Sequence, residues 1–270
     1  MTKKNEVAKA KKNEMATPYD YGQDAGQGMD LTLDDLKVPF IMLTQNESKA
    51  LDPDEENYIP GGKPGQLLNT KTKEYLDELI LVPASRKTSY VEWLPDRQGF
   101  AGEHEPTSQI VREAKANAAK RNELFTRAGN QLEETKSLYC IVLDEDGETP
   151  IDFCVVSFTS SKMVAWRDYF TALDSAKITK GAPLFANSFR LTAVKSERRS
   201  KKFFNYRLVP LRDADRNITD DPAQANVIGS LLAPDSPAYT AAKEMRDAIE
   251  SGRATADRET TEEPAEDRHF

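Results

Sequence analysis

The feature that most constrains the fold is a pair of apolar runs joined by a short acidic turn. Residues 137–143 and 151–158 are rich in apolar side chains, and four acids and a glycine lie between them at 144–148. Runs of this length around such a turn are typical of an antiparallel β-hairpin. The turn places Cys140 and Cys154 almost opposite each other on the two predicted strands.

These cysteines allow three interpretations: a redox switch, half of a metal site, or two small core residues. The chain holds two cysteines and two histidines, His104 and His269, and it has no CxxC motif. A metal site built from protein ligands usually needs four such groups. We therefore expect both cysteines to lie in the core, and we predict no metal and no cofactor.

Residues 31–100 contain further short runs of strand-type sequence separated by turn residues. The clearest turn is GGKPG at 61–65. Strands are predicted at 38–43, 66–69, 79–82 and 88–94. Short strands at this spacing favour an all-β core.

Three segments have helical character instead. Residues 107–128 are rich in Ala, Glu, Lys and Arg, which predicts a helical insertion beside the β core. A second helix is indicated by apolar residues at helical spacing, namely Met163, Trp166, Phe170 and Leu173. A third helix is predicted at 238–250, after Pro237.

Together these elements predict a mainly β (α+β) protein with inserted helices and disordered termini. We expect a disordered segment at 1–30, a mainly β domain at 31–212, a polar linker and helix at 213–250, and an acidic disordered tail at 251–270. No run approaches the ~18 apolar residues that span a bilayer. The lysine-rich N-terminus lacks the apolar region of a secretory signal, so a cytoplasmic location is expected.

Charge is distributed very unevenly along the chain. Between residues 177 and 212 there are ten Lys or Arg and one acid, a net of +9, whereas the whole chain has a formal net charge of −8. This contrast favours one surface that meets a polyanion. Half of the ten basic residues lie in the loop of a second predicted hairpin, with strands at 189–194 and 203–209: Lys195, Arg198, Arg199, Lys201 and Lys202.

Side chains alternate along the second strand of this hairpin. Phe204 and Tyr206 share one face, and Phe203 and Arg207 share the other. Because burying an arginine is costly, we expect the Phe203 and Arg207 face to point outward. There the ring would stack on bases and the cations would contact phosphates. The alternative is a solvated edge hairpin whose lysines only prevent aggregation.

A similar mixture of rings and cations occurs at Arg86, Lys87, Tyr90 and Trp93. The two rings have opposite parity on a strand, so one is expected in the core and the other at the surface as a stacking residue. The predicted nucleic-acid-binding residues are Arg86, Lys87, Tyr90, Trp93, Lys195, Arg198, Arg199, Lys201, Lys202, Phe203, Tyr206 and Arg207.

Catalytic motifs were not found. The GGKPG segment lacks the spacing of a phosphate loop, and the chain has no GxSxG, HExxH or GxGxxG motif. Asp144, Glu145 and Asp146 are carboxylates of the kind that hold a divalent cation in a nuclease, but at a hairpin turn they favour an exposed acidic turn. We therefore predict no enzyme and no catalytic residues.

The last twenty residues are acidic and end on an aromatic residue. Such a tail can compete for the chain's own cationic surface, or it can dock partner proteins; the simplest alternative is a solubilising tail. The predicted partner-binding residues are Glu262, Glu263, Glu266, Asp267 and Phe270.

These features resemble phage-encoded single-stranded DNA-binding proteins. The resemblance rests on KVPFIMLTQ at 37–45, the 61–65 turn leading to Asn69-Thr70, KTSYVEW at 87–93, FFNY at 203–206 and the acidic tail ending in Phe270. It implies that residues 31–212 are a nucleic-acid-binding domain with an OB-like β-barrel core. It also implies cooperative coating of replication or recombination intermediates, and contact with replication or recombination proteins through the tail. Arg258 and Arg268 dilute the charge of this tail.

The function expected from the sequence is sequence-independent binding of single-stranded DNA, without catalysis and with a possible homo-oligomer. The alternative is a virion or scaffold-like structural protein whose charged hairpin contacts another subunit. An accessory protein of a carboxylate-metal nuclease is a further alternative.

Overall fold

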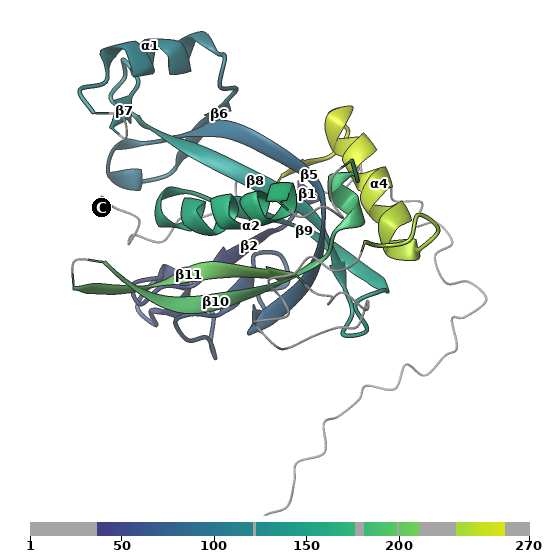
Figure 1. Ribbon diagram of the computed structural model, residues 1–270. Coiled ribbons are helices and arrows are strands. Elements are labelled where there is room, and N and C mark those ends of the chain that lie inside the picture. Colours follow the sequence, from purple (N-terminus) through teal and green to yellow (C-terminus); the bar gives the residue numbers. More distant parts are fainter. Residues whose placement is uncertain (1–36, 121–122, 176–180, 199, 211–230, 257–270) are drawn as a thin grey trace, which may run out of the picture. The chain divides into compact units, whose positions relative to one another are not determined.

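A single ten-stranded sheet is the largest feature of the computed structural model (Figure 1). The structure describes residues 37–120, 123–175, 181–198, 200–210 and 231–256. The predicted segment at 1–30 and most of the predicted tail lie outside these residues. The main strand order is β11 (Lys201–Pro210), β10 (Phe189–Arg198), β5 (Glu78–Trp93), β8 (Gln131–Leu143), β9 (Pro150–Phe158), β2 (Phe40–Leu43), β3 (Leu67–Asn69) and β4 (Tyr75–Leu76).

Two short strands extend this sheet, and one further pair is separate from it. β6 (Phe100–His104) pairs with β5, and β7 (Leu124–Phe125) pairs with β8. β1 (Lys37–Val38) pairs in parallel with β12 (Thr255–Ala256). The helices of the described residues are α1 (Gln109–Asn117), α2 (Met163–Ser175) and α4 (Pro237–Glu250), with short 3₁₀ turns between the strands.

The connectivity confirms the predicted mainly β fold with an OB-like core. β5, β8, β9, β10 and β11 occur in this order along the chain, with the short strands β6 and β7 between β5 and β8. In the sheet, β5 lies between β8 and β10. All four pairings among them are antiparallel. α2 connects β9 to β10. This is the arrangement of a five-strand Greek-key barrel, with its helix between the third and fourth strands.

The inner face of the curled sheet packs around α2. Phe158 lies edge-on to Trp166, with ring centroids 5.2 Å apart, and Tyr169 lies 5.0 Å from the Phe189 ring. Phe158, Phe189 and Leu138 are fully buried in this cluster. The predicted helix at 163 and its core-facing rings are therefore confirmed. This packing fixes α2 against β11, the outermost strand of the second hairpin.

The other face of the sheet is covered by α4, which begins after the cap residue Ser236. Ala238, Ala242 and Met245 are fully buried against the sheet. Small residues let the helix approach the strands closely. The predicted helix is confirmed, and it packs into the core. Most of the predicted polar linker before it lies outside the described residues.

The predicted tail boundary at 251 is wrong, because the ordered fold continues past α4. Ala254 is buried in the same cluster as α4, and Thr255–Ala256 form β12 beside β1. The polar character of 251–256 hid a short strand whose partner lies at the other end of the chain.

The first predicted hairpin is confirmed as β8 and β9. Cys140 and Cys154 are direct Cα partners, and both are buried and free. Burial raises the pKa of both thiols above the ordinary value. They are therefore neutral core residues at physiological pH, and neither is poised as a thiolate nucleophile.

The helical insertion predicted at 107–128 is only partly correct. α1 ends at Asn117, and Leu124–Phe125 pair with β8 as β7. The buried residues of α1 are Val111 and Ala114. This small apolar face gives little packing energy to stabilise a longer helix, so the helix ends at Asn117. Together β6, α1 and β7 form a lobe between β5 and β8 in the chain (Figure 1).

None of the helices in the described part of the chain has both the length and the apolar character that a membrane span requires.

Candidate nucleic-acid interface

The second hairpin is more regular than the sequence suggested. β10 and β11 remain paired up to Arg198 and Lys201. The connection is therefore two residues, and Ser200 within it has a left-handed φ of 69°. The predicted eight-residue basic loop is wrong, because its cations belong to the ends of two paired strands. They are presented by two paired strands rather than by a loop.

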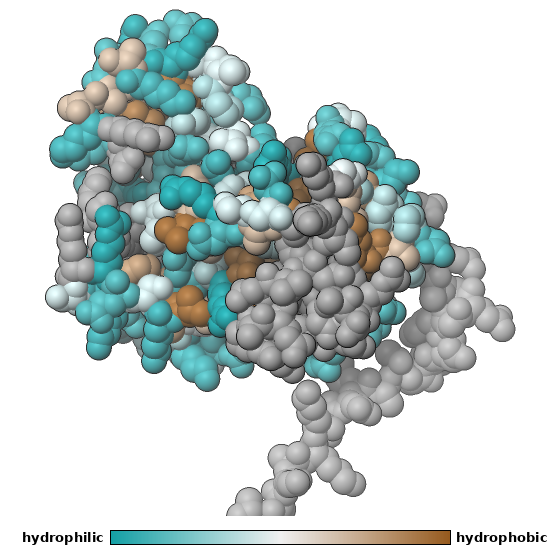
Figure 2. Space-filling view, in the orientation of Figure 1, coloured by the Kyte–Doolittle hydropathy of each residue, from teal (hydrophilic) through white to brown (hydrophobic). Residues whose placement is uncertain are grey.

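The cations of this ribbon are exposed to solvent. Lys195, Arg198, Lys201, Lys202 and Arg207 are all exposed, whereas Arg199 lies outside the described residues. Lys195, Lys202 and Arg207 form no ion pair with any residue that the structure describes. Hydrophilic side chains dominate the hairpin end in Figure 2. The term hairpin cations is used below for the five exposed residues Lys195, Arg198, Lys201, Lys202 and Arg207.

One face of β11 points inward, as the alternation predicted. The Tyr206 hydroxyl donates to the Ile41 carbonyl at 3.1 Å, and its ring lies 5.4 Å from that of Phe158. Phe204 is half-buried in the same cluster. The prediction of Tyr206 as a nucleic-acid-binding residue is therefore wrong, because its ring and its hydroxyl both make contacts inside the fold.

The opposite face of β11 is open, as expected. Arg207 is exposed and Phe203 is half-buried. Arg207 also lines a cavity of about 350 Å³ between α2 and the hairpin, together with Asn205, Val194 and Asp168. The Asn205 amide donates to the Ser161 carbonyl at 3.2 Å, so it holds this face against the start of α2. Arg207 thus flanks a groove beside the exposed ribbon.

A side-chain amide attaches the hairpin to the rest of the barrel. The Gln45 Nε2 donates to the Phe204 carbonyl at 2.9 Å, and the Phe204 N–H donates to Gln45 Oε1 at 2.8 Å. The amide thus replaces the peptide group that a neighbouring strand would supply. A Cβ on Gly65 would clash with the Phe204 ring, and Gly65 also has a φ of 88°. No local sequence pattern indicates this contact, because Gln45 and Phe204 are 159 residues apart.

Tyr90 and Trp93 do point to opposite faces, but neither is available as an exposed stacking ring. Each is 5% exposed. Tyr90 packs under α1, with the Lys115 Nζ 4.4 Å from its ring centroid. Trp93 contacts the Phe100 ring edge-on at 6.3 Å. The expectation that one ring lies at the surface is wrong, because the lobe after β5 covers both.

The two cations beside these rings have different surroundings. Arg86 is exposed, and its guanidinium carbon lies 5.2 Å from the Phe170 ring centroid. Lys87 is half-buried, and its ammonium pairs with Glu105 at 3.4 Å. Lys136, which the sequence did not single out, lies 5.7 Å from the Trp166 ring. Only the docking of α2 onto the sheet brings these cations and rings together.

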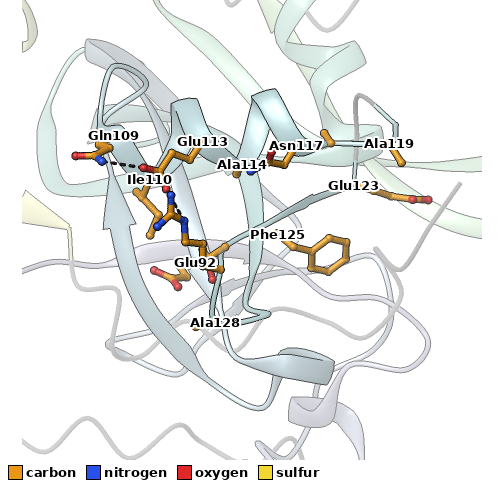
Figure 3. Close-up of a pocket in the computed structure, with 13 residues that line it drawn as sticks. Glu92, Gln109, Ile110, Glu113, Ala114, Asn117, Ala119, Glu123, Phe125 and Ala128 are labelled. Atoms are coloured by element: carbon orange, nitrogen blue, oxygen red, sulfur yellow. Dashed lines mark hydrogen bonds and ion pairs between the residues drawn. The ribbon is translucent and has the colours of Figure 1, made fainter.

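The lobe carries the other prominent hollow, a cavity of about 800 Å³ beside α1 (Figure 3). Glu92 on β5 lines it and is 8% exposed. The His104 Nε2 lies 2.6 Å from Glu92 Oε2, and the Asn130 amide donates to Glu92 Oε1 at 2.8 Å. Burial works to raise the pKa of Glu92, but the bonds from Asn130 and His104 outweigh it, so the pKa lies below its ordinary value.

The acidic turn of the first hairpin uses its carboxylates to hold the turn itself. Asp144 accepts from the Glu145 N–H, and Asp146 accepts from the N–H groups of Glu148 and Thr149. Across the residues that the structure describes, no group of three or more His, Cys, Asp or Glu is arranged to hold a metal ion. The nuclease interpretation gains no support from this geometry.

The hairpin tip and the lobe are two of the connections between the strands of the OB-like core. The hairpin tip joins the fourth and fifth strands of the Greek key, and the lobe joins the first and second. In OB folds these two connections flank the surface that binds oligonucleotides. The family comparison covers both of them, since a family described as Pam3 phage gp34-like protein matches residues 7–255.

The chain belongs to the Pam3 phage gp34-like family.

No curated protein and no solved structure matches the chain. The phage part of the predicted resemblance is confirmed by this gp34-like family. Binding of single-stranded DNA stays a prediction.

Proposed function

We propose that this gp34-like chain binds single-stranded DNA without sequence preference and coats it during phage replication or recombination. The proposal rests on one observation: the hairpin cations are exposed on the paired strands β10 and β11. These are the fourth and fifth strands of the OB-like core. Each phosphate that these cations neutralise releases counterions, which favours binding to any sequence. The proposal includes no catalytic step.

The regular pairing of the two hairpin strands supports this proposal. The cations lie at fixed positions on β10 and β11, and Gln45 and Tyr206 hold β11 to β2 and the segment after it. A preorganised set of charges loses less conformational entropy on binding than a set carried on a loose loop. A phosphate backbone would therefore meet the cations with little reorganisation of the protein.

Ring stacking contributes less than the sequence suggested. With Tyr90, Trp93 and Tyr206 buried, the ring of the predicted set with open surface is Phe203. Arg86, stacked over Phe170, offers a second flat surface near α2. Guanidinium planes also stack on bases, so Arg86 keeps its place among the proposed contacts.

The predicted partner-binding residues of the tail lie outside the described residues: Glu262, Glu263, Glu266, Asp267 and Phe270. We keep them in the proposal as a segment that competes with DNA for the hairpin cations and docks replication or recombination proteins.

Fluorescence anisotropy of a labelled oligo-dT, titrated with the chain across a series of salt concentrations, tests the proposal. Binding is expected at low salt, with an affinity that falls steeply as salt rises. Absent or salt-insensitive binding contradicts the proposal and favours the structural alternative, in which the hairpin contacts another protein subunit. Mg²⁺-dependent loss of the labelled strand would indicate a nuclease instead.

A further inference from the structure

The strand β10 has one edge without a partner strand over its outer half. β10 pairs with β5 at Phe189–Thr192, whereas its pairing with β11 continues to Arg198. In the described sheet, no strand lies beside Ala193–Arg198 on the side away from β11. Lys195 and Glu197 are exposed there. An open strand edge carries unpaired backbone groups that can pair with another strand.

The hydrogen bonds of β11 show which backbone groups point out from this edge. The Phe204 N–H and carbonyl both bond to the Gln45 amide, on the side away from β10. Lys195 is the Cα partner of Phe204, so the two form a non-hydrogen-bonded pair, and the N–H and carbonyl of Lys195 point away from β11. Glu197 lies two residues further along and has the same orientation. Among the described residues, none bonds to these outward backbone groups.

Glu197 is the one acid among ten basic residues between 177 and 212, and the proposed phosphate contacts give it no role. Its side chain is exposed, and it forms no ion pair with any residue that the structure describes. It lies on the same face of β10 as Lys195, because side chains two residues apart on a strand share a face. The open edge therefore presents one cation and one acid at the two residues whose backbone groups point outward.

We propose that two copies of the chain associate by antiparallel pairing of their β10 edges, with Ser196 opposite Ser196 of the partner subunit. In this register Lys195 lies opposite Glu197 of the partner subunit, and two-fold symmetry repeats the pair. The outward N–H and carbonyl groups of the two residues then bond to those of the other copy. Opposite charges across two strands stabilise their pairing, whereas a register centred on Lys195 or on Glu197 would place like charges opposite each other.

The proposed contact leaves most of the hairpin cations open. It uses Val194–Arg198 of each copy, which begins beyond Thr192, the last residue of β10 that pairs with β5. The result is a continuous sheet in the order β11, β10, β10 and β11. Lys201 and Lys202 lie on β11, away from the new contact. The inference therefore does not depend on DNA binding and is compatible with it.

Sedimentation velocity of the full chain without DNA, at low salt and over a range of protein concentrations, tests the pairing. The contact is small, so a weak dimer whose fraction rises with concentration is expected. Lys195→Glu and Glu197→Lys each place like charges opposite each other at both symmetric positions, and each should weaken dimerisation about 10-fold or more. The double variant restores opposite charges and the wild-type net charge, so it should dimerise like the wild type.

Lys243→Glu and Glu244→Lys are the matched controls, because both residues are exposed on α4 and the substitutions change the net charge by the same amounts. Neither should alter dimerisation. Disulfide trapping locates the contact, because the Cα atoms of a non-hydrogen-bonded antiparallel pair lie about 4.5 Å apart, within the range of a disulfide. Ser196→Cys should therefore give a covalent dimer on mild oxidation, whereas Lys243→Cys should not. The natural cysteines are buried.

Three outcomes would overturn the inference. A chain that stays monomeric at every concentration, with no crosslink through Ser196→Cys, does not pair in this way. A dimer that either charge reversal leaves unchanged uses another surface. A dimer that both single variants weaken and the double variant does not restore depends on the charge of the hairpin rather than on this register. Binding of oligo-dT is measured separately, so the proposed function stands or fails on its own titration.

Discussion

At the residue scale, Gln45 is the side chain on which the position of the hairpin depends most. It is 4% exposed and makes both hydrogen bonds to the Phe204 peptide group. No strand pairs with that edge of β11 in the described sheet. The Gln45 side-chain amide therefore makes the two hydrogen bonds to this edge of β11 that a neighbouring strand would otherwise make.

Replacing Gln45 by Ala should lower the free energy of unfolding by about 1–3 kcal/mol, because it leaves the Phe204 N–H and carbonyl without their partner. Urea denaturation measures this change. Asn46→Ala is the control, since Asn46 is exposed and its amide is 3.5 Å from the Lys202 carbonyl. Equal stability of Q45A and N46A would contradict the role assigned to the seam.

Glu92 gives the structure a pH-dependent contribution to stability. Its pKa is lower in the folded chain than the ordinary value, which is about 4.3 for an unfolded Glu. Its contribution is therefore complete above that value and is lost as the pH falls through the folded pKa.

Glu92→Gln should unfold more easily than the wild type near neutral pH, because hydrogen bonds to a charged group contribute about 1.5–3 kcal/mol. The difference in unfolding free energy between the two chains should shrink below about pH 4, where the wild-type carboxyl becomes protonated. Urea denaturation at several pH values measures it. A difference that grows on acidification would show that the pKa of Glu92 is raised, not lowered.

At the element scale, local patterns predicted the hairpins and two of the helices well. Apolar runs around the 144–148 turn predicted β8 and β9, and the spacing of Trp166 and Phe170 predicted α2. Strand parity also placed Phe204 inward and Arg207 outward. The pairings of β8 with β9 and of β10 with β11 join residues close in sequence, and the alternation of side chains along a strand depends on no distant partner.

Elements that depend on distant partners were not predictable in the same way. β5 is one strand of 16 residues, although the sequence suggested two, because the polar segment at Arg86 and Lys87 looked like an interruption. A register shift between Pro83 and Ser85 bends the strand instead of ending it. The burial of Tyr90 and Trp93 depends on the lobe that follows, which no pattern within 86–93 reveals.

At the scale of the whole molecule, the charge contrast between the hairpin and the rest of the chain is the main feature. The hairpin cations are exposed on one ribbon. Residues 257–270 carry six acids and two arginines, and the chain has a formal net charge of −8. If the chain binds DNA as proposed, this acidic segment competes with the strand for the same cations at low salt.

Removing residues 257–270 should therefore tighten binding of oligo-dT at low salt and have little effect at high salt, where charges are screened. Anisotropy titrations at two salt concentrations measure this. The shortened chain must keep every residue up to Ala256, because a deletion of 251–270 also removes β12 and the buried Ala254. An unchanged affinity at low salt would show that the segment does not compete for the hairpin.

The central claim is that the hairpin cations contact the phosphates of a single strand. The slope of log K against log salt tests it most directly, because each phosphate contact on a single strand contributes about 0.7 to that slope. The test variant replaces Arg198, Lys201 and Lys202 by Ala. A control with the same loss of charge replaces Lys71, Lys243 and Arg253, which are exposed elsewhere.

We predict that the hairpin variant flattens the slope by up to about 2 units and that the control leaves it close to the wild-type value. Equal slopes for the hairpin variant and the wild type, in chains of equal stability, would contradict the claim.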